Sequence, residues 1–225
     1  MTMDCLVVTG HFGSGKTEFA LHKALQWRKT DTKDVALCDL DVINPYFRAR
    51  EMKAWLEMNL IDLVAPKVEL MQSDLPVVSP EVSARLKKPN QRMIIDAGGG
   101  KEGALAVGQF SSLIANREYG LWFVANLNRP EVSSAEKILS SIQGIETTMR
   151  LKVTGIIHNT HLAGDPMDFE DIQKSGEIIS SVSESLKIPL KGTMIETSVF
   201  DSWTPAEQNQ LMLPLLFERK LKAPW

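Results

Sequence analysis

The chain has 225 residues, of which 44% are apolar and 24% are charged, and its formal net charge at pH 7 is −3. This length can bury one hydrophobic core and predicts a single domain over residues 1–225. Because there is no basic excess, we expect no nucleic-acid partner and no binding to an anionic membrane. No apolar run approaches the roughly 18 residues of a membrane span, and no signal peptide is expected.

The two cysteines lie in apolar segments and form no paired motif. Cys5 and Cys38 are therefore expected to be buried free thiols, which is typical of a reducing, cytoplasmic compartment.

Short apolar segments alternate with longer amphipathic segments along the chain. The first strand is expected over 5–10 and the first helix over 16–29. Further strands are expected over 34–40, 61–66, 91–100, 119–128, 152–160 and 188–195, and further helices over 45–59, 79–88, 103–117, 130–143 and 168–187. The tail from 204 is expected to begin a helix that Pro214 bends or ends.

The expected strands are apolar on both faces. Such strands, alternating with helices, predict an α/β fold with three layers, a doubly wound and mostly parallel sheet covered on both sides. Ligands of these sheets bind beyond the carboxyl ends of the strands, where the polar motifs of this chain fall.

A glycine-rich loop connects the first strand to the first helix. It reads G-x-x-x-x-G-K-T, and this context predicts a P-loop, whose backbone N–H groups and helix N-terminus bind phosphate. The Lys16 ammonium is expected to reach the β- and γ-phosphates, and the Thr17 hydroxyl is expected to bind Mg²⁺. The predicted nucleotide-binding residues of the loop are Gly10, His11, Phe12, Gly13, Ser14, Gly15, Lys16 and Thr17.

Carboxylates stand at the ends of two further strands. Asp96 ends the segment MIID and is expected to support Mg²⁺, and the N–H of Gly99 in the following D-x-x-G is placed to sense the γ-phosphate. Asp39 and Asp41 are two residues apart and point the same way if their strand persists. One of them would support the metal shell, and the other would orient or deprotonate the attacking water. The alternative is that these aspartates cap the helices that follow.

Together these segments resemble the MinD/ParA/CobQ-type P-loop ATPases, the branch with a deviant Walker A motif. The resemblance covers nearly the whole chain and rests on the loop at 10–17, CDLDVINPYF at 38–47, IIDAGGG at 94–100, NLNRPEVSSAEKIL at 126–139 and GIIHNT at 155–160. It implies that Asp41 activates the water, that Asp96 supports Mg²⁺ and that Asn159 contacts the nucleotide base. The implied function is an ATPase that binds Mg²⁺ and ATP and hydrolyses ATP to switch conformation toward a partner. Asp39 then remains for the metal shell.

The sequence departs from this family at two places. The family's signature lysine follows the first glycine of the loop and reaches the nucleotide of a partner subunit, and here that position is His11. Histidine is shorter and mostly neutral at pH 7, so we expect His11 to pack locally, and the formation of a nucleotide-bridged homodimer stays open. MinD itself ends in a basic amphipathic helix that binds membranes, whereas Pro214 interrupts this tail, which is expected to pack on the body.

The expected nucleotide is ATP. The GTPases of this broad group, such as the nickel-insertion proteins of urease and hydrogenase, carry N/S-K-x-D, whose aspartate binds the two N–H donors of guanine. The corresponding Asn159-Thr160-His161-Leu162 has neither the lysine nor the aspartate.

His158 and His161 form an H-x-x-H to which Asp165 could add a third ligand, but we expect a histidine pair without metal.

Other functions stay open on the sequence. One is an ATP-dependent small-molecule ligase or transferase, as on the CobQ/dethiobiotin-synthetase side of the group, with segment 69–81 either lining a substrate pocket or forming a solvated loop. Another is a GTPase resembling the metallochaperones, and a third is a nucleotide-binding regulatory module without turnover. The partner is accordingly either a protein or a small-molecule substrate.

Overall fold

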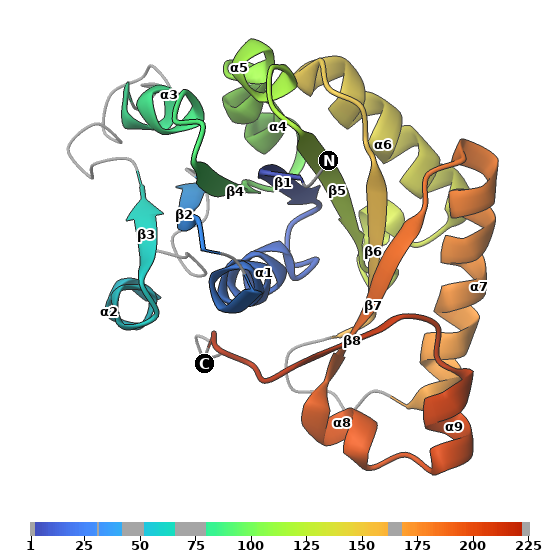
Figure 1. Cartoon of the computed structure of the whole chain (residues 1–225). Helices are drawn as coiled ribbons and strands as arrows, with labels where there is room; N and C mark the ends of the chain where they lie inside the picture. Colours follow the sequence, from blue (N-terminus) through green and yellow to red (C-terminus); the bar gives the residue numbers. More distant parts are fainter. Residues whose placement is uncertain (1–2, 31, 42–51, 66–79, 162–167, 222–225) are drawn as a thin grey trace.

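The computed structural model describes residues 3–30, 32–41, 52–65, 80–161 and 168–221. These residues form one eight-stranded sheet in the order β3-β2-β4-β1-β5-β6-β7-β8, in which every neighbouring pair is parallel (Figure 1). The strands are β1 (Cys5–Gly10), β2 (Asp34–Leu40), β3 (Ile61–Val64), β4 (Gln91–Ala97), β5 (Tyr119–Ala125), β6 (Gly155–Asn159), β7 (Leu190–Glu196) and β8 (Pro214–Phe217).

Helices cover both faces of the sheet, which confirms the predicted three-layer fold. α1 and α2 lie on one face and α3 to α7 on the other, with α8 and α9 near the end formed by β7 and β8 (Figure 1). The helices are α1 (Lys16–Thr30), α2 (Lys53–Met58), α3 (Pro80–Leu86), α4 (Gly100–Gly108), α5 (Ser111–Ala115), α6 (Ala135–Met149), α7 (Phe169–Leu186), α8 (Thr197–Asp201) and α9 (Pro205–Gln210).

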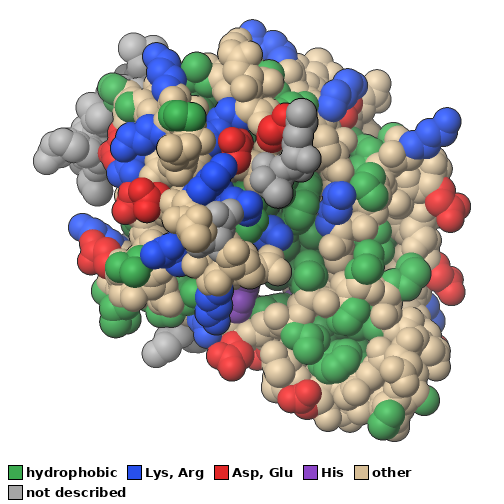
Figure 2. All heavy atoms as spheres, viewed as in Figure 1, with side chains coloured by type: hydrophobic (Ala, Val, Ile, Leu, Met, Phe, Trp, Pro, Cys, Tyr) green, Lys and Arg blue, Asp and Glu red, His purple; other side chains and the backbone are tan. Residues whose placement is uncertain are grey.

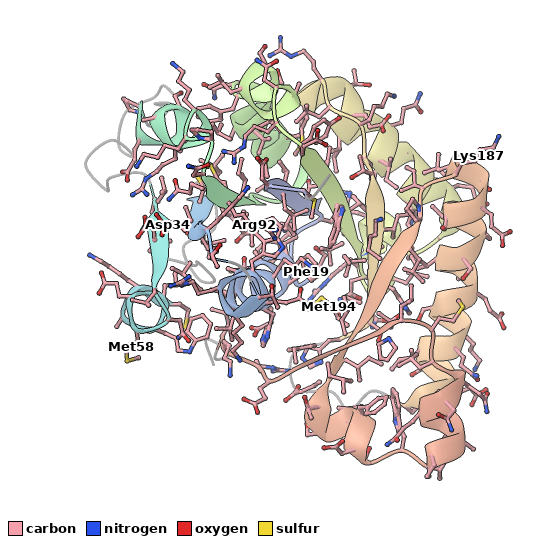
Figure 3. The ribbon with its side chains drawn as sticks, viewed as in Figure 1. Phe19, Asp34, Met58, Arg92, Lys187 and Met194 are labelled. Carbon is pink, nitrogen blue, oxygen red and sulfur yellow. The ribbon has the colours of Figure 1, made fainter. Side chains whose placement is uncertain are left out.

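Successive side chains of β1 point to opposite faces of the sheet, and both sets are apolar because both faces are covered by helices. Leu6 and Val8 pack in the core beneath α1, whereas Cys5 and Val7 pack in the core on the opposite face. Phe19 of α1 fills the first of these layers together with residues such as Met194 of β7, and the two lie near each other in Figure 3. Each such buried side chain contributes about 1.5–3 kcal/mol through removal of apolar surface from water. Both cysteines are buried free thiols, as expected.

Two predicted helices have different bounds in the structure. The segment 103–117 forms two helices, α4 and α5, with Gln109 and Phe110 between them. The segment 130–143 begins as a short 3-10 helix (Pro130–Val132), after which the Ser134 side chain caps α6 and the helix continues to Met149. Of the predicted helix 45–59, the part within the described residues forms α2, and 45–51 lies outside them.

The predicted tail helix begins where expected and ends at Gln210, a few residues before Pro214. A capping box between Thr204 and Glu207 starts the short helix α9, but the chain then forms β8, which pairs with β7 at the edge of the sheet. Pro214 is tolerated there because a proline without an N–H fits the first residue of an edge strand. The expected packing of the tail on the body is confirmed for the described residues, since Phe217 is buried in the core beneath α1.

In the described residues, no helix combines the length and the apolar character that crossing a membrane requires.

Candidate nucleotide-binding site

The predicted P-loop connects the end of β1 to the start of α1. Gly15 has a φ of 92°, a conformation that residues with a side chain rarely adopt. A Cβ at this position would also collide with the side-chain amide of Asn159 at the end of β6. The loop therefore needs glycine here for two independent reasons. Because α1 begins at Lys16, the loop lies at a helix N-terminus, the arrangement that binds anions.

Lys16 is folded back over the loop. Its Nζ donates a hydrogen bond to the backbone oxygen of His11 at 2.9 Å, and its side chain is buried. Burial lowers the pKa of the Lys16 ammonium, while the carboxylates of Asp96 and Asp41 act in the opposite direction. The lysine thus lies close to two of the three aspartates that the sequence placed at this edge of the sheet.

The structure brings the three aspartates together. Asp39 on β2 lies directly opposite Asp96 on β4 in the parallel register, and both side chains are buried. The Asp39 carboxylate accepts a hydrogen bond from the backbone N–H of Asp41 at 3.0 Å. The Asp41 carboxylate lies against the glycine loop after β4, where a Cβ on Gly98 would be 3.2 Å from its Oδ1. None of these aspartates is a helix cap for the described helices.

Asp96 is a buried acid whose pKa lies far from its ordinary value. Burial and the neighbouring Asp39 carboxylate raise the pKa of Asp96 to about 7, against the opposing effects of Lys16 and Thr17. Neither carboxylate oxygen of Asp96 accepts a hydrogen bond of good geometry among the described residues, although the Thr17 hydroxyl lies close enough to lower the pKa of Asp96 as a donor would. A buried carboxyl group without such hydrogen bonds is costly unless it is protonated or neutralised by a cation.

These residues fit a Mg²⁺ ion that is held jointly with a nucleotide. In the described residues, no group of three or more His, Cys, Asp and Glu side chains is arranged to hold a metal by itself. Mg²⁺ characteristically takes one or two protein oxygens together with water and substrate phosphates. The Thr17 hydroxyl and the buried carboxylate of Asp96 supply oxygens of this kind at the loop.

The glycine loop after β4 touches the P-loop. A Cβ on Gly99 would be 2.9 Å from the backbone nitrogen of Phe12, so the two loops are in contact at this point. The side chain of Phe12 itself is 61% exposed. The contact places the D-x-x-G segment beside the predicted phosphate site.

His11 points away from the loop. Its Nε2 lies 3.0 Å from the hydroxyl of Ser141 on α6, and burial lowers the pKa of its imidazole, which is therefore neutral at pH 7. We expected local packing on the loop, and the structure instead attaches this side chain to a neighbouring helix.

Asn159 supports the P-loop from the end of β6. Its Nδ2 donates to the backbone oxygen of Ser14 at 2.8 Å, and its Oδ1 accepts from the backbone N–H of His161 at 3.2 Å. The structure thus shows this side chain bracing the loop, and its contact with a nucleotide base stays a prediction.

The two histidines of the H-x-x-H diverge. The Nε2 of His158 lies 2.9 Å from the hydroxyl of Ser175 on α7, and burial lowers the pKa of His158 to about 4. His161 contacts Arg219 in the C-terminal segment. Asp165 and residues 69–79 of the segment 69–81 lie outside the described residues.

Arg129 is a site residue that the sequence analysis did not identify. It follows β5, the neighbour of β1 in the sheet, and its Nε donates to the backbone oxygen of Gly13 at 3.0 Å. In the sequence, residues 126–139 contribute to the family resemblance and indicate no role for Arg129 itself. The adjacency of β5 and β1 is the signal that would have found this residue, because loops at the carboxyl ends of adjacent parallel strands meet.

No protein-family model matches the chain, and no curated protein sequence matches it. Several solved structures do match the chain. The cell division protein FtsY from Thermotoga maritima has a TM-score of 0.59 at 18% identity, over 86% of this chain and 62% of that one. The signal recognition particle receptor FtsY from Elizabethkingia anophelis, in complex with GDP, has a TM-score of 0.54 at 17% identity, over 94% of this chain and 61% of that one.

A nucleotide-binding protein from Archaeoglobus fulgidus, in complex with ADP, has a TM-score of 0.50 at 15% identity and is covered over 91% of its length, with 92% of this chain aligned. The chain spans about three fifths of the FtsY structures that it matches. At these identities the likeness shows the fold alone. The sheet, the loop and these neighbours define a nucleotide-binding P-loop NTPase fold, and the finer resemblance to MinD/ParA/CobQ proteins stays a prediction.

Proposed function

We propose that the chain is a P-loop ATPase of the MinD/ParA/CobQ type, which binds Mg²⁺ and ATP and hydrolyses ATP to switch conformation toward a partner. One observation carries the proposal: a lysine and three aspartates from three adjacent strands gather around a loop built to bind phosphate. Buried charges are costly to keep for stability alone, and clusters of perturbed ionisable groups are typical of functional sites.

Each residue then has a role that follows from its position. The N–H groups of the loop and the N-terminus of α1 bind the phosphates, and Lys16 exchanges its bond to the His11 oxygen for a phosphate oxygen. Thr17 and Asp96 hold Mg²⁺, which when bound neutralises the charge that develops between the β- and γ-phosphates. Asp41 orients or deprotonates the attacking water.

Asp39 positions the two other aspartates of the site. Its carboxylate accepts the backbone N–H of Asp41 and faces Asp96 across the strand pair, so it fixes the first residue and raises the pKa of the second. This observation favours a supporting position in the metal shell over a direct bond to the metal.

The residues near the predicted base site favour adenine. Guanine recognition needs a carboxylate for two N–H donors, and the turn after β6 begins with Asn159-Thr160-His161, which has none. The carboxylate of Glu196 at the end of β7 is paired with Arg219 at 3.2 Å. GTP is the second candidate, because an FtsY neighbour is a GDP complex, whereas another neighbour is an ADP complex.

The glycine loop after β4 is the segment proposed to change conformation. It contacts the P-loop at Phe12 and the Asp41 carboxylate at Gly98, so a γ-phosphate would meet it directly. Loops that order on a γ-phosphate and relax after hydrolysis are a common switching element.

The partner would be a protein, a second copy of the chain or a small-molecule substrate. The face in Figure 2 shows lysine and arginine interspersed with aspartate and glutamate, which does not favour nucleic acid.

The test is steady-state hydrolysis of Mg-ATP and Mg-GTP by wild type and Asp41→Asn across a range of protein concentrations. We expect Asp41→Asn to keep nucleotide binding and to lose about 10²- to 10⁴-fold in turnover, the usual contribution of a general base. Asp34→Asn is the matched control, because Asp34 is exposed at the opposite end of β2 (Figure 3). Undiminished turnover in Asp41→Asn would contradict the assignment. Turnover per chain that rises with concentration would indicate a nucleotide-bridged dimer.

A further inference from the structure

Arg129 lies across the middle of the P-loop. Its Nε donates to the Gly13 backbone oxygen, and a Cβ placed on Gly13 would be 2.7 Å from Cζ and 2.8 Å from Nη2. Gly13 also has a φ of 68°, a left-handed conformation that favours glycine. The guanidinium group therefore packs directly on the loop, over a glycine whose missing side chain leaves room for it.

The backbone around Arg129 is fixed by local hydrogen bonds. Its N–H donates to the oxygen of Asn126 at 3.0 Å, and its own oxygen accepts the N–H of Val132 at 3.0 Å. The Asn126 side chain in turn donates to the oxygen of His161 at 2.9 Å. The arginine is thus presented to the loop from an anchored turn rather than from a long free segment.

The guanidinium group of Arg129 is held at the loop by a hydrogen bond to the backbone. Among the described residues no ion pair involves this side chain, and the hydrogen bond from Nε is the interaction that holds it. A guanidinium group that gives one N–H to the loop keeps further N–H donors for an anion bound at the same place.

We infer that Arg129 binds the nucleotide phosphates from within the same chain, and that it supplies there the second positive charge of the site. This inference rests on the proposed function, since it requires phosphate at the loop, and it names a specific further contact for that site. Arginine has five N–H donors in a planar fork, so one can hold the Gly13 oxygen while others remain for phosphate oxygens. A cation supplied in this way also stabilises charge that develops during phosphoryl transfer.

The inference gives a reason why the loop functions with histidine after its first glycine. His11 is turned toward Ser141 and is neutral at pH 7, so it adds no charge to the phosphates. Arg129 brings a charge to the same loop from the β5–α6 connection. The chain then needs no cation from a second copy to complete its phosphate site.

The test is isothermal titration of Mg-ATP and Mg-ADP at two salt concentrations with Arg129→Ala, Arg129→Lys and Arg28→Ala. We expect Arg129→Ala to weaken both nucleotides about 10- to 100-fold, as loss of a charge-assisted hydrogen bond does, and to reduce the salt dependence of binding. Arg129→Lys should recover part of the affinity, because it restores the charge without the fork. Arg28→Ala is the control, since Arg28 lies in the last turn of α1, about three turns from the loop, and should bind as wild type.

Lys16→Ala separates failure of this inference from failure of the proposed function. If Lys16→Ala loses ATP binding while Arg129→Ala binds ATP as wild type, the inference is overturned and the proposed function stands. If both variants bind as wild type, the loop is not the nucleotide site, and the proposed function falls with the inference. If Arg129→Ala weakens binding with unchanged salt dependence and also lowers the melting temperature of the nucleotide-free protein, Arg129 only braces Gly13 and the inference is overturned.

Discussion

At the scale of single residues, the carboxyl group of Asp96 makes the stability of the fold depend on pH. An unfolded chain releases this proton near pH 4, whereas the folded chain holds it up to about pH 7. Between these values the folded state binds more protons than the unfolded state, so the free energy of unfolding decreases as pH rises through this window. The site therefore costs stability at neutral pH when no cation neutralises it.

We predict that Asp96→Asn stabilises the nucleotide-free protein above pH 7, because it removes this cost. The full effect of the pKa difference is on the order of 4 kcal/mol, which is an upper bound since the environment relaxes. Urea unfolding of wild type and variant in EDTA at pH 5 and pH 8 measures it. We expect the advantage of the variant to be larger at pH 8. Equal differences at the two pH values would contradict a raised pKa of Asp96.

His158 changes stability with pH in the opposite direction. Its pKa in the folded state is about 4, below the value near 6.5 in an unfolded chain, so stability is lost as pH falls from 6.5 toward 4. We predict that His158→Gln, which keeps a hydrogen-bonding side chain for Ser175, flattens this acid loss in the same unfolding assay. An unchanged slope between pH 6.5 and pH 4.5 would show that His158 is not the responsible group.

The sequence predicted the loop residues of the site but not its second cation, Arg129, and the reason is that the loop is a local pattern whereas Arg129 is distant in the chain. Residues 10–17 are consecutive, so their spacing alone predicts a phosphate loop. Arg129 reaches Gly13 only because β5 pairs with β1, a strand order that the sequence does not contain. The hydrogen bond from Asn159 to the backbone oxygen of Ser14 could not be predicted either, because it depends on which strand end lies beside the loop.

At the scale of elements, the C-terminal segment is fastened to α1 beside the loop. The Glu18 carboxylate accepts the backbone N–H of Lys220 at 2.8 Å and that of Leu221 at 3.1 Å. His22, one turn further along α1, has its Nε2 2.8 Å from the Glu218 backbone oxygen. Glu18 follows Lys16 by two residues, so the attachment of the tail and the phosphate site share the first turn of one helix.

We predict that Glu18→Ala releases this segment, because two backbone donors lose a charged acceptor. The free energy of unfolding should fall by about 1–3 kcal/mol, and cleavage of the C-terminus by a protease should become faster. Urea unfolding and limited proteolysis measure the two effects. Glu170→Ala on the exposed first turn of α7 is the control and should change neither. A Glu18→Ala protein as stable and resistant as wild type would contradict the role of the attachment.

The elements that the sequence predicted correctly are those whose periodicity is sustained. α1 and β1 have the predicted starts because a buried strand, a glycine loop and an amphipathic helix follow one another without interruption. The strand at 214–217 was not predicted, because this short run carries no helical or strand period of its own and its conformation is set by pairing with β7. The division between α4 and α5 was also missed, since no proline marks it.

At the scale of the whole molecule, the parallel sheet explains why separate motifs form one site. Every strand of the described sheet runs the same way, so the residues that follow β1, β2, β4, β5 and β6 meet at one edge. The loop, the aspartates, Arg129 and Asn159 come from these five strand ends. The sequence predicts a parallel sheet, and therefore that the motifs lie together at the carboxyl ends of its strands. The order of the strands, which decides which of these motifs touch one another, comes from the structure.

The most direct test of the central claim, that this loop binds a magnesium nucleoside triphosphate, is titration of Mg-ATP and Mg-GTP into wild type and Lys16→Ala. We predict that wild type binds ATP in preference to GTP and that Lys16→Ala binds at least about 10-fold more weakly, because it loses the buried cation of the phosphate site. Stronger binding of GTP would keep the site and reverse the choice of base. Binding of either nucleotide to Lys16→Ala as tight as to wild type would contradict the account.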